Sequence, residues 1–165
     1  MLGIDPGTAI LGYGVVTGCA GSAAALVECG VVRARAGDPL PLRLANIFEA
    51  VSALLEQHRP DVMAVEGLFH GRNARSALVL GHARGVVLLV AARAGVPVAE
   101  ISPAEVKRAV TGTGSATKPQ VGAMVMRLLR LSAAPRPADA ADGVAIALTH
   151  LLRARPRIRP AQGRR

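Results

Sequence analysis

Three short apolar segments joined by very short links restrict most strongly how this chain can fold. The segments cover residues 2–5, 12–19 and 25–33, and the links between them are rich in glycine. Two parallel strands need a crossover of roughly a dozen residues or more, so links this short allow only antiparallel neighbours. The first part of the chain therefore predicts an antiparallel, three-stranded meander.

The remaining chain alternates between helical and strand-like segments. Two further short strands fit residues 62–66 and 97–101. Helices fit residues 42–58, 73–94, 103–110, 118–131 and 137–154. Asn73 is a candidate N-cap for the second helix, which Gly95 ends. Strands connected through helices are parallel, so we expect an α/β domain. Its mixed five-stranded sheet would have the first strand at its centre, the first three strands antiparallel, and helices at its flanks.

Composition limits the class of protein further. The 165 residues suffice for one domain with a full core, and hydrophobic residues make up 51% of them. Residues 6–27 are uncharged, but their five glycines favour two strands with turns over a membrane span. No basic region precedes them, so no signal peptide is predicted. Cys19 and Cys29 fit a reducing compartment, and we expect a cytoplasmic protein without a membrane segment.

The positive charge of the chain is unevenly distributed. The net charge is +9, and six arginines in residues 153–165 supply most of it, which leaves +3 for residues 1–152. Within that body, residues 67–99 hold four arginines and residues 106–138 hold six basic residues, and neither block contains an acid. A charge run is often only a solvated face, but two acid-free blocks suggest a polyanionic partner.

Two acidic residues end predicted inner strands. Asp5 follows the apolar segment LGI, and Glu66 follows VMAV. A carboxylate at the end of an inner strand is costly unless something pairs with it. Either residue alone could be a simple turn former, but two on neighbouring strands suggest a shared cation.

A second acidic pair stands near the start of the last predicted helix. Asp139 and Asp142 are three residues apart, which places them on one helix face. Acids near a helix N-terminus are also favoured by the helix dipole, so a structural role stays open. Carboxylate ligands without histidine or cysteine suit Mg²⁺ or Mn²⁺. Two such ions, roughly 3.5–4 Å apart, can activate a water and stabilise the leaving oxygen of a phosphodiester.

Four sequence blocks, in order along the chain, resemble the RuvC family of Holliday-junction resolvases, which have the RNase H-like fold. The blocks are LGIDPGT…GYGVV at 2–16, VEGLFHGRNARSALVLGHARG at 65–85, VKRAVTGTGSATKPQV at 106–121 and ADAADGVAIALTH at 138–150. The first block alone is unspecific, because sugar kinases of the actin-like superfamily open similarly. Those kinases need two lobes, which 165 residues cannot supply. The resemblance implies a nuclease domain at residues 1–154, and the low-complexity Arg/Pro composition of residues 155–165 predicts a basic, disordered tail.

The resemblance also implies roles for single residues. The family's four acidic metal ligands fall on Asp5, Glu66, Asp139 and Asp142, which would hold two Mg²⁺ ions, with Mn²⁺ as a substitute. Lys107 and Lys118, the only lysines in the chain, match catalytic basic residues near the scissile phosphate. The aromatic residue that the family inserts at the junction falls on Phe69, and we expect further DNA contacts from Arg72, Asn73 and Arg75.

The implied activity is symmetric cleavage of a four-way DNA junction in recombination and repair. A homodimer would hydrolyse one phosphodiester in each of two opposed strands and leave 5′-phosphate and 3′-hydroxyl ends. The implied protein partners are RuvA and RuvB, which bind the junction and drive branch migration. Ala77, Gly81 and Gly85 recur every four residues and would allow close helix approach in the dimer, although core packing under the sheet explains them equally well. Two other functions stay open: a nuclease acting on another nucleic acid, such as a ribosomal RNA precursor, and a non-catalytic junction-binding module.

Overall fold

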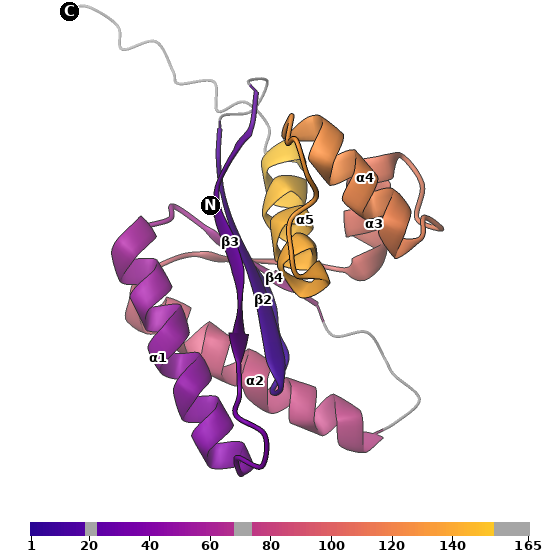
Figure 1. Ribbon diagram of the computed structural model, residues 1–165. Helices are drawn as coiled ribbons and strands as arrows, with labels where there is room; N and C mark the ends of the chain where they lie inside the picture. The colour runs from indigo at the N-terminus through magenta and orange to yellow at the C-terminus, as the bar shows by residue number, and fades with distance from the viewer. Residues whose placement is uncertain (19–22, 68–73, 154–165) are drawn as a thin grey trace, which may run out of the picture.

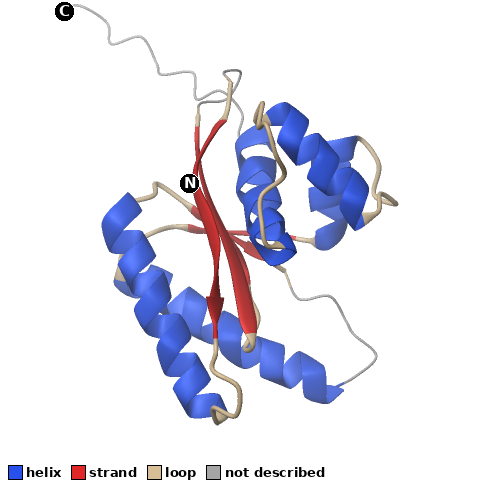
Figure 2. Ribbon diagram, in the orientation of Figure 1, coloured by secondary structure: helices blue, strands red, loops and turns tan. Residues whose placement is uncertain are grey.

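The computed structural model describes residues 1–18, 23–67 and 74–153 and shows the predicted order of elements (Figure 1, Figure 2). The strands are β1 (Leu2–Asp5), β2 (Ile10–Thr17), β3 (Ala25–Arg33), β4 (Met63–Glu66) and β5 (Val98–Ile101). The helices are α1 (Leu40–His58), α2 (Ala74–Arg93), α3 (Pro103–Thr111), α4 (Lys118–Leu128) and α5 (Ala138–Arg153).

The five strands form one mixed sheet in the order β3-β2-β1-β4-β5. β2 pairs antiparallel with both β1 and β3, whereas β4 pairs parallel with both β1 and β5. The predicted antiparallel meander and the central first strand are both confirmed. The short links enforce the first feature, and the helical connections before β4 and β5 allow the second.

Helices cover both faces of the sheet (Figure 1). Leu2, Ile4 and Val65 point to the face on which α1 and α2 pack. Alternate residues, such as Ala64 and Ile101, point to the other face, where α5 lies directly on the strands and α3 and α4 pack outside it. Because side chains alternate along a strand, this division also determines on which face Asp5 and Glu66 lie.

Glycines bring α5 unusually close to the sheet. A Cβ atom added to Gly3 or Gly12 would collide with the backbone of Gly143 or Asp139 in α5. A Cβ atom on Gly143 would in turn lie 2.6 Å from the backbone of Tyr13 in β2. Only residues without a side chain allow this approach. The glycines therefore let the first turns of α5 lie against the ends of β1 and β2.

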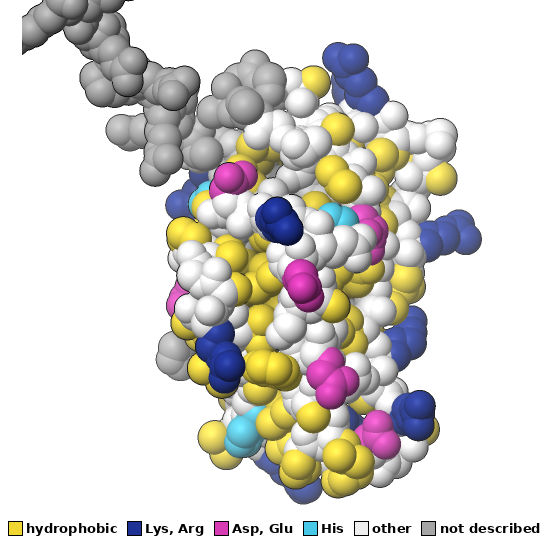
Figure 3. Space-filling model, turned by 90° about the vertical axis from the view of Figure 1, so that its left-hand side faces the viewer, with side chains coloured by type: hydrophobic (Ala, Val, Ile, Leu, Met, Phe, Trp, Pro, Cys, Tyr) yellow, Lys and Arg dark blue, Asp and Glu magenta, His cyan; other side chains and the backbone are white. Residues whose placement is uncertain are grey.

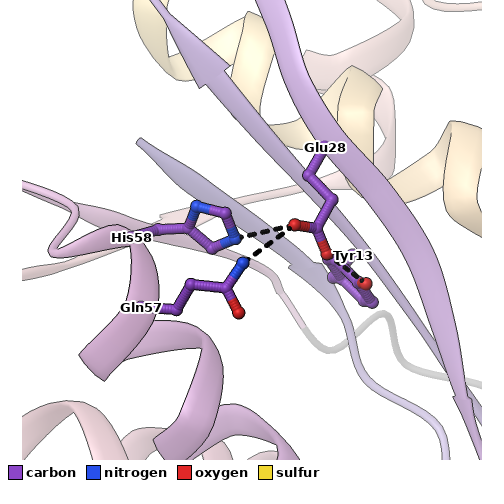
Figure 4. Close-up of polar contacts among 4 residues, drawn as sticks. All are labelled: Tyr13, Glu28, Gln57 and His58. Carbon is purple, nitrogen blue, oxygen red and sulfur yellow. Dashed lines mark hydrogen bonds and ion pairs between the residues drawn. The ribbon is translucent and has the colours of Figure 1, made fainter.

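A polar cluster joins the end of α1 to β2 and β3 (Figure 4). The Tyr13 hydroxyl donates a 2.8 Å hydrogen bond to Glu28 of β3. The other carboxylate oxygen of Glu28 accepts a 3.2 Å hydrogen bond from Gln57 and lies 3.0 Å from Nε2 of His58. Burial, followed by the bond to Glu28, raises the pKa of Tyr13 to about 12. The cluster thus anchors α1 to β3 with groups that pair one another.

The predicted boundaries agree with the structure to within two residues, except at one helix end. α4 ends at Leu128, whereas the sequence predicted residue 131. Arg130 adopts a left-handed conformation with φ of 53°, and the Leu131 N–H donates to the Met126 carbonyl. This bond pattern closes a helix and is usually built on glycine, so the sequence does not reveal it. The proposed cap of α2, Asn73, lies outside the described residues.

Length and hydropathy alone would allow α2 to cross a membrane, the one such helix in the described part of the chain. A single helix of this kind is weak evidence for a membrane span. α2 buries Ala83, Val87, Val90 and Ala91 in the core, together with the charged Arg84. Its opposite face carries exposed apolar residues, which are considered below.

Candidate metal centre

Asp5 and Glu66 lie side by side at one edge of the sheet. Each is the last residue of its strand, and the parallel register pairs Ile4 with Val65 directly before them. Ile4 and Val65 point toward α1 and α2, so both carboxyl groups point toward α5. The two acids therefore lie next to each other, as the sequence predicted.

The two carboxyl groups disturb each other's protonation. Burial raises the pKa of Glu66 to about 7, and the negative charge of Asp5 adds to the effect. Burial also raises the pKa of Asp5, followed by the charge of Asp142. A hydrogen bond between the two groups raises the pKa of Glu66 and lowers that of Asp5. Two acids this close favour either a proton or a cation between them.

The start of α5 adds the second acidic pair. Asp139 lies in the first helical turn and Asp142 follows one turn later, and both are half-buried. Their negative charges contribute to the raised pKa of Asp5. Lys118, the first residue of α4, places Nζ 2.8 Å from Oδ2 of Asp142. This bond raises the pKa of Lys118. The fold thus gathers four carboxyl groups and one ammonium at the ends of β1, β4 and α5.

The donors fit a hard divalent cation by their chemistry, although they are not arranged as finished ligands. Among the described residues, no three Asp, Glu, His or Cys side chains converge closely enough to coordinate one ion. Asp142 is turned to Lys118, and Asp5 and Glu66 hydrogen-bond to each other, so three of the four acids already have a local partner. A bound cation would replace both interactions. Carboxylate-only donors are the ligands that Mg²⁺ and Mn²⁺ prefer.

The other predicted site residues are placed less centrally. Lys107 lies half-buried in α3, and its charge is not among the largest influences on Asp5 or Glu66, whereas that of Lys118 is. Arg75, in the first turn of α2, lines a hollow of about 320 Å³ together with Thr8 from the loop after β1. Phe69, Arg72 and Asn73 lie outside the described residues.

Arg84 is a charged residue whose place the sequence analysis missed. It was counted in the basic block of residues 67–99, but its side chain is only 8% exposed. The guanidinium donates a 2.7 Å hydrogen bond to the backbone carbonyl of Glu66 and lies 2.6 Å from a carboxylate oxygen of Glu100. One signal in the sequence was available: Arg84 shares a helix face with the apolar Val87 and Ala91.

Comparisons with known proteins agree on one family. The family model described as crossover junction endodeoxyribonuclease RuvC matches residues 1–150. The protein of that name from Brevibacillus brevis is 52% identical over 150 residues, which cover 91% of this chain and 90% of that protein. Its counterpart from Salinispora arenicola is 50% identical over 161 residues, covering 98% and 92%.

Solved structures agree on the fold. The chain resembles Thermus thermophilus RuvC in complex with a Holliday junction substrate, with a TM-score of 0.86, 42% identity and 92% of each chain covered. The yeast mitochondrial Holliday junction resolvase, at 14% identity and a TM-score of 0.63 over 92% of this chain and 78% of that one, shares the fold alone. The mixed sheet with flanking helices is thus the RNase H-like fold of the resolvases. On its sequence and its fold, the chain belongs to the RuvC family of crossover junction endodeoxyribonucleases.

Proposed function

We propose that this RuvC-family protein resolves Holliday junctions during recombination and repair, by hydrolysing one phosphodiester in each of two opposed strands. The observation that carries the proposal is the mutual electrostatic influence of Asp5, Glu66, Asp139, Asp142 and Lys118, which lie near one another at the ends of β1 and β4 and the starts of α4 and α5. Hydrolysis at the 3′-oxygen of the scissile phosphate would leave 5′-phosphate and 3′-hydroxyl ends. The Thermus thermophilus relative was solved with a Holliday junction substrate, which supports the same substrate here.

The four carboxyl groups would hold two Mg²⁺ ions, or Mn²⁺ in their place. Such ions, when bound, supply an activated water and stabilise the leaving oxygen of the phosphodiester. The residues of the chain prepare this step. Glu66 would give up its proton on binding a cation, because the positive charge would offset the burial and the repulsion from Asp5 that raise its pKa.

Lys118 is the basic residue best placed to act on the phosphate. Its side chain is 77% exposed and is held at the site by Asp142. If the ammonium group of Lys118 shifts from Asp142 to the scissile phosphate, it would stabilise the negative charge that develops there. Lys107 and Arg75 remain proposed DNA contacts beside it. Phe69, Arg72 and Asn73 are proposed contacts on the strength of the family resemblance.

The outer face of α2 is the surface that we propose for the homodimer. Ala77, Gly81 and Gly85 line a groove of about 850 Å³ on this face. A Cβ atom on Gly81 or Gly85 would meet nothing within 4 Å, so core packing under the sheet does not explain these two glycines. Leu78 and Leu89 beside them are 66% and 53% exposed.

Apolar exposure of this extent is typical of an interface. Figure 3 views the molecule from the side on which α1 lies, and yellow apolar side chains gather there between scattered charged ones. A two-fold axis through α2 would give two identical active sites, which match the two-fold symmetry of a four-way junction. The dimer thus accounts for paired cleavage.

The cellular setting follows from the same proposal. RuvA and RuvB are the partners that the family resemblance implies for delivering and migrating the junction. The relatives from Brevibacillus brevis and Salinispora arenicola are bacterial, and bacterial DNA lies in the cytoplasm, so we infer a cytoplasmic location.

We also propose that residues 1–154 form the nuclease domain and that residues 155–165, with five arginines, form a DNA-binding tail.

Cleavage assays on matched substrates test the proposal. A synthetic four-way junction should be nicked in pairs in Mg²⁺, whereas duplex DNA and structured RNA of the same sequence should stay intact. Faster cleavage of the RNA would favour a nuclease with another nucleic-acid substrate. Junction binding without any cleavage in Mg²⁺ or Mn²⁺ would favour the non-catalytic binding module. The Glu66→Gln protein is the matched control, because it should bind the junction and leave it uncut.

A further inference from the structure

The carbonyl group of Glu66 lacks its normal partner in the sheet. The Leu2 N–H donates to the Val62 carbonyl at 3.1 Å, which sets the hydrogen-bond pattern between β1 and β4. Donors of a parallel ladder recur every second residue, so the donors that follow Leu2 are residues 4 and 6. The paired register of β1 and β4 ends at Ile4 and Val65, and its continuation by one step would place the Glu66 carbonyl opposite residue 6. Residue 6 is Pro6, which has no N–H.

The peptide group after Glu66 cannot find this partner in β5. The Gly67 N–H donates to the Ile101 carbonyl at 2.8 Å and therefore points toward β5. The carbonyl of Glu66 belongs to the same peptide plane and points the opposite way, toward β1. An unpaired carbonyl in this half-buried position would cost free energy and leave the end of β4 loose.

Arg84 supplies the missing donor from the other face of the sheet. Its guanidinium reaches up from α2 and donates to the Glu66 carbonyl at 2.7 Å. A second nitrogen of the same group lies 2.6 Å from Glu100 on β5. The planar guanidinium thus holds one orientation between two elements, and it contacts the backbone of Glu66 while the carboxyl group points away toward α5.

We propose that Arg84 is a positioning residue for the metal centre. By replacing the ladder bond that Pro6 cannot make, it fixes the backbone of Glu66 so that the carboxyl group faces Asp5. Arg84 touches neither substrate nor cation and acts only through Glu66. The inference rests on the proposed function of Glu66 as a metal ligand.

The test compares Arg84→Gln with the native protein and with Glu100→Gln. Glu100→Gln removes the ion pair but keeps the bond to the Glu66 carbonyl. Mn²⁺ binding to the protein without DNA is measured by isothermal titration calorimetry, beside the melting temperature. Arg84→Gln should weaken Mn²⁺ binding by about 10- to 100-fold, the usual effect of removing a group that orients a metal ligand. Glu100→Gln should bind Mn²⁺ as the native protein does.

A merely structural role for Arg84 would lower the melting temperature of Arg84→Gln and leave its Mn²⁺ affinity unchanged, and that result would overturn the inference. If Arg84→Gln does not fold, Arg84→Met takes its place, because methionine keeps the apolar stem but has no donor for the Glu66 carbonyl. Native Mn²⁺ affinity in Arg84→Met would likewise overturn the inference.

A double-mutant cycle tests the explanation through Pro6. Pro6→Ala returns an N–H opposite the Glu66 carbonyl, so Arg84→Gln should weaken Mn²⁺ binding less in that background than in the native one. An equal loss in both backgrounds would refute the missing ladder donor as the reason for Arg84.

Failure of the proposed function looks different. The proposed metal centre itself would be refuted if the native protein binds no Mn²⁺. It would also be refuted if the Glu66→Gln protein cuts junctions at the native rate. Normal Mn²⁺ binding by both the native and the Arg84→Gln proteins would refute only the positioning role of Arg84.

Discussion

Replacing Glu66 with glutamine should make the metal-free protein more stable while abolishing cleavage. The carboxyl group of Glu66 is half-buried beside Asp5, and its pKa is raised from 4.5 to about 7. Glutamine has the same shape, carries no charge and can still donate a hydrogen bond to Asp5. The substitution therefore removes the cost of the buried charge and the repulsion from Asp5 without opening a cavity.

The size of the effect follows from the pKa. A shift of this size corresponds to about 3–4 kcal/mol at most, since one pKa unit is about 1.4 kcal/mol. Solvent screening of a half-buried group and the nearby ammonium of Lys118 reduce this limit, and we expect a gain of about 1.5 kcal/mol in the free energy of unfolding. For a domain of this length, that gain raises the melting temperature by about 3–6 °C.

The gain should depend on pH in a defined direction. Below the ordinary pKa of 4.5, Glu66 is protonated in both the folded and the unfolded chain and costs nothing. Between 4.5 and about 7 the unfolded chain has lost this proton while the folded chain still holds it, so the stability of the native protein falls as pH rises. Above about pH 7 the loss is complete, and there the advantage of Glu66→Gln should be greatest.

Thermal and urea denaturation in EDTA from pH 4.5 to 8.5 measure this difference. Glu49→Gln is the control, because it removes an exposed acid from α1, remote from the metal centre. Mg²⁺ should cancel the advantage of Glu66→Gln, since the cation stabilises the native cluster. An unchanged or lower melting temperature for Glu66→Gln at pH 8 without metal would refute the repulsion, and cleavage at the native rate would refute the ligand assignment.

Four further predictions concern DNA and the dimer. Lys118→Ala should slow cleavage by roughly 100-fold and change junction affinity far less in a gel-shift assay, whereas equal losses would make Lys118 a binding residue only. Gly85→Glu should sediment as a monomer and nick without symmetry, because it adds bulk and charge to the apolar outer face of α2, and a Gly85→Glu protein that stays dimeric would move the interface elsewhere. Removal of residues 155–165 should weaken junction binding and reduce its dependence on salt concentration; an unchanged salt slope would show that the tail does not contact DNA. Phe69→Ala should keep its melting temperature but cut slowly, with partial rescue on a junction already unpaired at the crossover. A loss of several kcal/mol in stability would instead identify Phe69 as a core residue.

The candidate site shows where inference from the sequence was sufficient. The proximity of Asp5 and Glu66 could be predicted from the sequence, because each residue ends an apolar strand and a central first strand places the two strand ends side by side. The spacing of Asp139 and Asp142 placed both on one helix face. The close approach of α5 that brings the two pairs together was not predicted. It depends on Gly3, Gly12 and Gly143 facing backbone from distant parts of the chain.

Local patterns of the sequence determined the elements, their order and the direction of the strands, because periodicity and link length act over a few residues. Only the tertiary structure decided which charged groups meet. The apolar helix face of Arg84 pointed to its burial, but no local pattern showed that its guanidinium would meet the carbonyl of Glu66, although Pro6 had already removed the ladder donor. Likewise, the bond from Lys118 to Asp142 joins residues 24 positions apart. Such contacts depend on strand register and helix packing, which no short segment encodes.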